Sequence, residues 1–216
     1  DWGGLWNYSW RTGSDQYGDP VPNSMYRYLW SNGPKECLEF ADYSFEEHFG
    51  QPIPSFPPRE VLYDYIIGRI KKADVNKYIR FNTTVTSVIY NEKEFEVTSL
   101  NKKDNTFSKE NFDYVVVATG HFSVPYIPEY EGMESFPGRI LHSHDFRDAE
   151  EFRDKNIVVL GSSYSAEDVG LQCYKYGAKS VTIGYRNNPM GFKWPPGMKE
   201  VHFLDKLEGK KATFKD

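Results

Sequence analysis

The sequence predicts an α/β protein built from parts of two dinucleotide-binding units. The run 157–184 reads as a strand, a glycine-containing turn, a helix and a second strand, which is the order of a parallel β-α-β unit of the Rossmann type. The run 114–118 is continuously apolar and is followed by Thr119 and Gly120, as expected of a buried parallel strand that ends in a tight turn. We expect both units to be incomplete within the 216 residues.

The first 60 residues are rich in glycine, proline, asparagine, serine and aromatic residues and show little periodicity. They predict long loops with short helical pieces, for instance between Cys37 and Phe49. Loops of this length in a compact domain either wrap a ligand or pack on something absent from this chain. Aromatic residues make up 17% of the chain and gather in this first third. Flat rings in loops suit a planar ligand, although rings that fill a core would give the same composition.

The next segment predicts a helix followed by an antiparallel meander. Between Glu60 and Lys72 the apolar side chains recur at helical spacing, and basic residues end the run, as a helix C-terminus favours. Short extended runs separated by polar turns then predict the meander, at 79–81, 84–91, 95–100 and 106–109.

A proline-rich crossing at 124–128 predicts a domain boundary near Ser123, with residues 1–122 in one domain and 123–216 forming a linker and part of a second. The second unit is expected to run through strand 157–160, helix 166–176 and strand 180–184. The tail from Gly197 shows no partner strand that would complete a sheet. Because neither end reads as a natural domain terminus, we expect a truncated chain.

Composition argues against several classes of partner. The net charge is −5 and the charged residues are scattered, so nucleic acid and anionic membranes are not expected ligands. Cys37 and Cys173 lie far apart without ligand-spaced neighbours, which argues against a disulfide framework or a metal site and favours a reducing cytoplasm. No apolar run approaches the roughly 20 residues that cross a bilayer. We therefore expect a cytoplasmic protein with small-molecule partners, present as a homodimer.

The clearest local signal is a turn that opens the predicted helix directly after strand 157–160. It consists of Gly161, Ser162, Ser163, Tyr164, Ser165 and Ala166. Gly161 permits the tight turn, Ala166 keeps the helix close to the sheet, and the amides at the helix N-terminus face a pyrophosphate with the favourable end of the helix dipole. Ser163 departs from the usual pattern, which has its second glycine there, and its side chain is expected to crowd the phosphate.

The end of the next strand predicts which dinucleotide binds. Arg186 stands near the place where an acidic residue would hold a ribose hydroxyl. An arginine there favours a 2′-phosphate, and hence NADPH over NADH, whereas the alternative is a solvated surface charge. Lys193 and Trp194 follow this strand and are candidates to contact the adenine end, with a plain surface loop as the equal alternative.

A spaced motif lies in the link before the predicted strand 157–160. Phe136, Gly138, His142 and Phe146 follow the spacing F-x-G-x-x-x-H-x-x-x-F. This spacing resembles the identifying sequence of flavin-containing monooxygenases and their Baeyer–Villiger relatives. The motif lies between Ala-Thr-Gly at 118–120 and the turn 161–166, in the order found in that family. Runs 30–37 and 162–168 are similar to the bacterial, trimethylamine-oxidising members, and the resemblance covers essentially the whole chain.

The resemblance implies an FAD domain with an inserted NADPH domain and assigns roles to individual residues. Asn32 is implied beside the flavin, where a turn residue before Gly-Pro is the alternative, and Tyr164 is implied to approach the flavin and nicotinamide. We expect a structural role for His142. The residues that the resemblance places near FAD are Gly4, Leu5, Trp6, Met25, Val88, Thr119 and Gly120. A further glycine-rich FAD fingerprint is expected before Asp1.

The implied reaction consumes NADPH and dioxygen. NADPH reduces FAD, oxygen adds to give a flavin C4a-hydroperoxide, and a small soft nucleophile takes up the outer oxygen, as in conversion of trimethylamine to its N-oxide or oxidation of a sulfide. Three alternatives stay open. A Baeyer–Villiger or N-hydroxylating monooxygenase has a related sequence pattern, and a truncated NADP(H)-binding fragment would not turn over. A flavin-dependent dithiol reductase needs a C-x-x-C pair that this sequence lacks.

Overall fold

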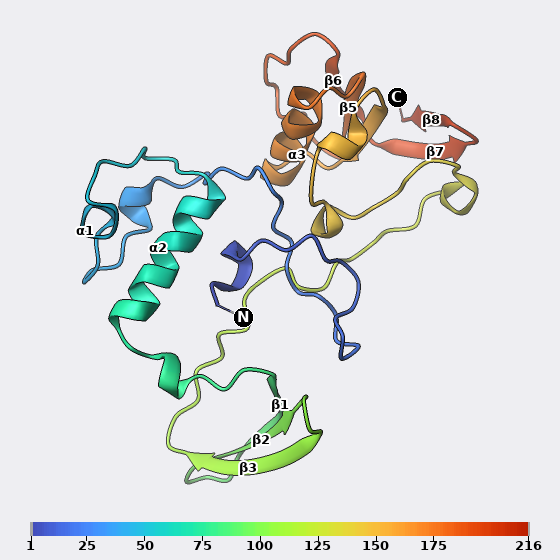
Figure 1. The fold of residues 1–216 in the computed structure, drawn as a ribbon. Helices are drawn as coiled ribbons and strands as arrows, with labels where there is room; N and C mark the ends of the chain where they lie inside the picture. Colours follow the sequence, from blue (N-terminus) through green and yellow to red (C-terminus); the bar gives the residue numbers. More distant parts are fainter. Residues whose placement is uncertain (1, 216) are drawn as a thin grey trace. The chain divides into compact units, whose positions relative to one another are not determined.

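The computed structural model describes residues 2–215 and has the predicted mixed α/β architecture (Figure 1). Its residues form two compact units. The first holds the segment that ends at Asn7, then Gly13–Val21 and Trp30–His121. The second holds Tyr8–Thr12, Pro22–Leu29 and the chain from Phe122 onward. Two short segments of the N-terminal loops therefore belong with the second unit.

The loops of the first unit contain the short helical pieces that its sequence predicts. These are η1 (Gly4–Trp6), η2 (Lys35–Cys37), α1 (Phe45–Phe49) and η3 (Asn76–Tyr78). Helix α2 (Arg59–Lys72) confirms the predicted amphipathic helix. The buried ring of Tyr65 on α2 stacks on Phe45 of α1 with 3.8 Å between centroids, which forms the core of this unit together with Tyr43 and Leu62.

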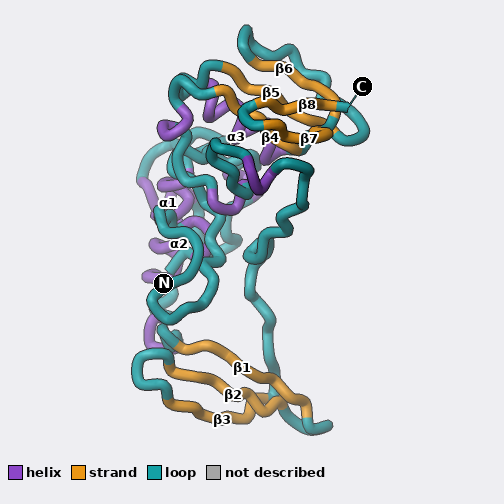
Figure 2. The backbone as a smooth tube through the Cα atoms, turned by 90° about the vertical axis from the view of Figure 1, so that its right-hand side faces the viewer, coloured by secondary structure: helices purple, strands orange, loops and turns teal. Residues whose placement is uncertain are grey.

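The antiparallel meander is also confirmed. Strands β1 (Thr83–Tyr90), β2 (Phe95–Asn101) and β3 (Thr106–Phe112) lie side by side in the order β1-β2-β3, as Figure 2 shows. The additional strand expected at 79–81 is wrong. Asn82 takes a left-handed φ of 54°, which interrupts the extended backbone, and the ladder begins only where Thr83 pairs with Asn101.

The buried strand expected at 114–118 is wrong as well. These residues form no strand, and the side chains of Tyr114 and Val116 are 87% and 86% exposed. A parallel strand needs hydrogen-bonded neighbours and covered faces, and the described residues place no strand beside this run. Its apolar sequence therefore has no burial to drive it into a ladder.

The second unit contains the predicted β-α-β element. Strand β4 (Asn156–Leu160) leads through α3 (Tyr164–Lys175) to the parallel strand β5 (Ser180–Tyr185). Ala166 and Cys173 of α3 pack with Val181 and Ile183 of β5 and with Met198 in one buried cluster. This cluster holds the helix against the sheet, and it places the turn between β4 and α3 at the carboxyl edge of the strands.

The tail corrects the expectation that it lacks a partner strand. Strand β6 (Met198–His202) pairs in parallel with β5, and β7 (Leu204–Glu208) pairs with β8 (Lys211–Phe214) as a hairpin. The Glu200 carboxylate accepts hydrogen bonds from the amides of Met190 and Gly191, at 2.6 and 3.0 Å. These bonds fix the loop that connects β5 to the parallel strand β6. In run 198–202 Met198 is buried, Lys199 is exposed and the other three residues are half-buried, so its sequence carries no continuous apolar signal.

Before β4, the second unit also contains the short 3₁₀ helices η4 (Met133–Ser135), η5 (Ser143–Asp145) and η6 (Glu150–Phe152). His142 Nδ1 accepts a hydrogen bond of 3.0 Å from the amide of His144 and so caps η5. This contact supplies the structural role expected of His142. Among the described residues, no helix is both long and apolar enough to cross a membrane.

Candidate functional site

The turn between β4 and α3 has the geometry of a phosphate loop. Gly161 follows the last residue of β4 and takes φ 133°, a conformation that side-chain-bearing residues rarely adopt. Its amide donates to the Gly184 carbonyl of β5 at 2.9 Å, so the turn starts from a fixed point on the sheet. A Cβ at Gly161 would find only the methyl of Ala166, at 3.9 Å, within contact distance, which leaves the space above the turn open.

The start of α3 leaves main-chain donors available. Ser163 is the N-cap residue, but its side chain makes no capping hydrogen bond. Its carbonyl accepts from the amides of Ala166 and Glu167, at 2.9 and 3.1 Å, as the first bonds of the helix. The amides of Tyr164 and Ser165 precede these and have no acceptor within the helix. Together with the positive end of the helix dipole, such donors favour an anion.

Ser163 itself fits this turn without backbone strain. Its φ of −133° and ψ of −174° are extended values that any residue adopts. Ser162 is half-buried and Ser165 is exposed, while Ala166 is buried against the sheet. Close packing against the sheet therefore requires a small residue at position 166, whereas the three serine side chains are available to a ligand.

Tyr164 is the first residue of α3, and its side chain is 75% exposed. A large ring that the protein leaves uncovered at the mouth of a phosphate loop is free to cover a bound ligand. The sequence-based role of Tyr164, in contact with cofactor, is compatible with this placement.

Arg186 follows β5 and its side chain is exposed. Its guanidinium lies 5.1 Å from the centre of the Phe203 ring, a cation–π distance. Both residues line a cavity of about 430 Å³ at the carboxyl ends of β5 and β6, together with Tyr130 and His202. Burial raises the pKa of Tyr130, against the effect of the nearby Arg186 charge. His202 Nδ1 is buried without a hydrogen-bond partner among the described residues.

The two residues predicted at the adenine end differ in exposure. Lys193 is exposed. Trp194 is half-buried, packs on the core cluster of the second unit, and meets the Phe192 ring edge to face at 5.5 Å. Trp194 therefore packs against the core from the loop between β5 and β6, and its contact with the adenine end remains a prediction.

In the first unit, the residues predicted near FAD occupy loops and a sheet face. Gly4, Leu5 and Trp6 form η1, where Leu5 is exposed and Trp6 packs on the core of the unit. Val88 is exposed on β1. Thr119 and Gly120 are exposed, and Gly120 takes φ 80°.

Asn32 projects from a turn that its neighbours hold rigid. The Ser31 hydroxyl donates to the Gly33 carbonyl at 2.7 Å and accepts from the Gly33 amide at 3.2 Å. The Ser31 amide donates to the Pro57 carbonyl at 2.9 Å, and the Ser31 side chain is buried. Asn32, between these anchors, is exposed, so its amide group is free to meet a ligand in a defined position.

Met25 is placed differently from the other residues predicted near FAD. It belongs to the second unit, where its side chain is only 2% exposed. Its amide donates to the Asn23 side chain at 2.7 Å. A buried thioether supports packing in this structure, and the contact with FAD expected of Met25 remains a prediction.

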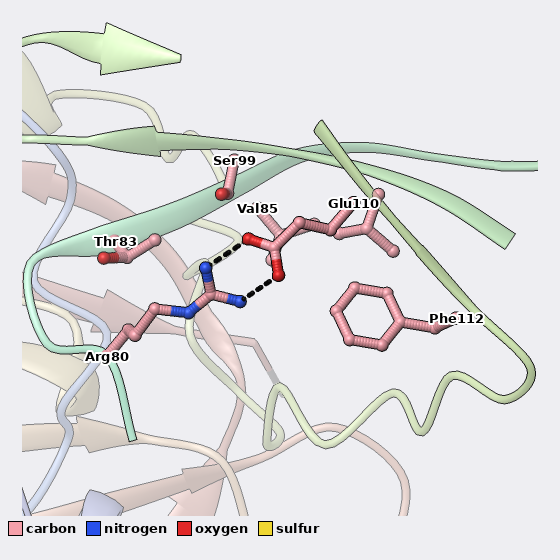
Figure 3. A pocket seen from close by; sticks show the side chains of 7 residues that line it. Arg80, Thr83, Val85, Ser99, Glu110 and Phe112 are labelled. Carbon is pink, nitrogen blue, oxygen red and sulfur yellow. Dashed lines mark hydrogen bonds and ion pairs between the residues drawn. The ribbon is translucent and has the colours of Figure 1, made fainter. Parts of the chain in front are cut away.

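A second hollow, of about 240 Å³, lies on the meander (Figure 3) and contains none of the predicted site residues. The Arg80 guanidinium and the Glu110 carboxylate form a bidentate pair in it, with Nη2 and Oε2 at 3.0 Å. The pair raises the pKa of Arg80 and lowers that of Glu110. Because the two charges satisfy each other, this hollow offers no unpaired group to a cofactor. No cluster of metal-ligating side chains is found among the residues described.

Two polar residues with clear structural tasks were missed by sequence reasoning, Arg147 and Tyr26. Arg147 directly follows Phe146 of the spaced motif, a position that the motif could have drawn attention to. No local pattern indicated the hydrogen bond of Tyr26, because its partner Asp168 lies 142 residues further along the chain.

The β-α-β element and its phosphate loop define a dinucleotide-binding α/β protein. Residues 1–190 match the family described as "Flavin-binding monooxygenase-like", and the chain belongs to that family. The prediction made from the spaced motif and its flanking features is thereby confirmed.

The chain is similar to several named members. It is 79% identical over 216 residues to a trimethylamine monooxygenase of Pelagibacter ubique strain HTCC1002, covering 100% of this chain and 49% of that protein. The crystal structure of Tmm from Pelagibacter sp. strain HTCC7211 superposes with a TM-score of 0.96 at 74% identity, over 100% of this chain and 49% of that one. The S-allyl-L-cysteine S-oxygenase of Allium sativum gives a TM-score of 0.83 at 28% identity, over 98% and 51%. The chain thus spans about half the length of the relatives it matches.

Proposed function

We propose that this chain carries part of an FAD- and NADPH-dependent monooxygenase that converts trimethylamine to its N-oxide. The supporting observation is the 79% identity to a trimethylamine monooxygenase over the full 216 residues. The family assignment and the exposed phosphate loop at 161–166 support the cofactor part of the proposal. Sulfides, as other soft nucleophiles, are the second substrate class, favoured by the likeness to an S-oxygenase.

The second unit would hold the reductant. The free amides of Tyr164 and Ser165 would bind the pyrophosphate at the N-terminus of α3, and the Arg186 guanidinium would pair with the 2′-phosphate. The exposed ring of Tyr164 would cover the nicotinamide end and help to exclude water. Lys193 and Trp194 would lie toward the adenine.

The first unit would meet the flavin. The rigid turn around Ser31 would present the Asn32 amide to the flavin edge, where it can donate and accept hydrogen bonds. Gly4, Leu5, Trp6, Val88, Thr119 and Gly120 would contribute further contacts, as would Met25, which belongs to the second unit. When bound, FAD supplies the oxygen-transfer chemistry and NADPH the reducing equivalents. The protein itself would bind and orient the two cofactors and shield them from water.

The domain assignment follows from this function. We assign residues 1–122 to the FAD-binding domain and 123–216 to the linker and NADPH-binding domain. We also place the enzyme in the cytoplasm and expect a homodimer; light scattering of the purified protein would test the oligomeric state.

The decisive experiment is NADPH oxidation with trimethylamine, with amine oxide and hydrogen peroxide measured together, on a protein extended at both ends to the length of its relatives. We expect flavin absorbance in the purified protein and amine oxide in equimolar amount to the NADPH consumed. Peroxide without oxide would overturn the proposal, and ketone-dependent NADPH consumption would indicate a Baeyer–Villiger enzyme instead. A protein without flavin absorbance that still binds NADPH would be the non-catalytic alternative.

A further inference from the structure

We propose that Tyr26 is a positioning residue for dinucleotide binding, acting through Asp168 on helix α3. This inference rests on the proposed function. Tyr26 lies in the segment Pro22–Leu29, here called the strap, which belongs to the second unit although it is far from α3 in sequence. Tyr26 and Tyr28 of the strap contact α3 and its C-cap residue Tyr176.

The strap is anchored by a buried arginine. Arg147 Nη2 donates to the main-chain oxygen of Asn23, in the strap, at 2.6 Å and to that of Arg11 at 2.9 Å. Arg147 Nη1 donates to the His144 carbonyl at 2.6 Å. The Arg147 carbonyl in turn accepts from the Arg27 amide at 2.8 Å. A guanidinium that is 7% exposed and satisfied by fixed carbonyls holds the strap in one position.

Tyr26 connects the anchored strap to the first half of α3. Its hydroxyl donates a hydrogen bond to the Asp168 carboxylate, and its ring meets the edge of Phe146 with 5.3 Å between centroids. Burial, and then the bond to Asp168, raise the pKa of Tyr26, so the hydroxyl keeps its proton and remains a donor at neutral pH. The hydrogen bond to a charged acceptor is of the stronger kind.

Tyr28 connects the strap to the second half of α3. Its carbonyl accepts from the Gln172 side chain at 3.0 Å, and its ring stacks on Tyr176 with 4.6 Å between centroids and 12° between planes. Its hydroxyl, by contrast, bonds Glu150 at 3.1 Å and touches no residue of α3 through that bond. The two tyrosine hydroxyls therefore differ in their partners, and the Tyr28 hydroxyl provides a matched control.

Asp168 lies two residues beyond Ala166, the last residue of the phosphate loop. A bond that fixes Asp168 thus fixes the turn of α3 that follows the loop amides. Loss of the Tyr26 hydroxyl is expected to loosen this turn. The consequence is weaker binding of NADPH without loss of the fold, because the ring and the other strap contacts stay in place.

The test measures nucleotide affinity on the FAD-loaded protein, for NADP⁺ by calorimetry and for NADPH from the concentration dependence of anaerobic flavin reduction, together with the melting temperature. Tyr26→Phe is expected to weaken affinity about tenfold, as loss of a hydrogen bond to a charged group does. Tyr28→Phe should leave it unchanged. Asp168→Asn keeps an oxygen acceptor and should restore near-normal affinity, whereas Asp168→Ala should match Tyr26→Phe. The double variant Tyr26→Phe with Asp168→Ala should be no weaker than either single one.

Two results would overturn the positioning role while leaving the proposed function intact. One is wild-type NADPH affinity in Tyr26→Phe. The other is an equal loss in Tyr28→Phe, which would point to general loosening of the strap. If Tyr26→Phe does not fold, the comparison of Asp168→Asn with Asp168→Ala decides, and equal affinities of these two would reject the inference. Failure of the wild-type protein to bind NADPH at all would instead overturn the proposed function and, with it, this inference.

Discussion

The Arg147 guanidinium donates a hydrogen bond of 2.6 Å to the main-chain oxygen of Asn23, which lies 124 residues earlier in the chain. Arg147 directly follows the last residue of the spaced motif, so the motif that marks the family ends beside a residue that secures an N-terminal loop. The contact explains why an arginine is buried there, since four main-chain carbonyls accept hydrogen bonds from its guanidinium.

Arg147→Met is expected to destabilise the protein by about 2–4 kcal/mol, because several buried carbonyls lose their donors while the apolar stem is kept. Thermal or urea unfolding measures the change. Arg139→Met is the control, because Arg139 is exposed and its ion pair with the half-buried Glu151 is worth no more than about 1 kcal/mol. Equal effects of the two substitutions would contradict the anchoring role of Arg147.

Arg186→Ala is expected to weaken NADPH binding by about ten- to a hundredfold and to leave NADH binding nearly unchanged, because only NADPH carries the 2′-phosphate. Titration of each nucleotide into the purified protein gives the ratio. Lys199→Ala, which removes an exposed charge on β6, is the control. Equal losses for both nucleotides would remove the assignment of Arg186.

Asn32→Ala, in a protein of the relatives' full length, is expected to abolish oxygenation while NADPH oxidation continues and peroxide is released. The reason is that the amide on the Ser31 turn is the group proposed to meet the flavin edge. Asn76→Ala, at an exposed asparagine of the same unit, is the control and should give normal amine oxide. Normal oxide from Asn32→Ala would exclude the role.

Two glycines are expected to respond oppositely to alanine. At Gly170 on α3, a Cβ would meet Ile183, Val181 and Met198 at 3.5–3.6 Å, which is ordinary contact, so Gly170→Ala should stabilise by about 0.5–1 kcal/mol through helix propensity. At Gly132, with φ 80°, a Cβ would lie 1.9 Å from the Leu207 carbonyl oxygen. Gly132→Ala should therefore destabilise by about 2 kcal/mol or more. Calorimetric melting of both variants tests the pair, and a destabilised Gly170→Ala would contradict the packing.

The two cysteines are expected to differ in reactivity. Burial, aided by the Glu151 charge, raises the pKa of Cys173 to about 12, while Cys37 is exposed. Because the thiolate is the reactive form and a raised pKa keeps the thiol protonated until the pH approaches that value, an aromatic disulfide reagent at pH 8 should label Cys37 alone. Cys37→Ser should abolish labelling of the folded protein, and denaturant should expose Cys173. Rapid labelling of Cys37→Ser in the native state would contradict the burial.

Local signals made part of the fold predictable. The helix ending at Lys72, the meander and the β-α-β element depend on periodicity and turn residues within short windows, and each appears near its predicted bounds. The phosphate loop was predictable for the same reason, since the Gly161 turn and the start of α3 are adjacent in sequence. The prediction of a strand at 114–118 was wrong, because an apolar run forms a buried strand only where neighbouring strands cover it.

By itself, the sequence determined the family and the loop that would hold a dinucleotide, because both depend on residues at short, fixed spacings. Only the tertiary structure decided that β6 joins β5, that Trp194 lies against a core, and that a strap near residue 26 secures α3. These features depend on hydrogen bonds and burial between residues far apart in the chain. Such contacts form only when the fold brings both partners together, and a local sequence pattern does not show which distant residue the partner is.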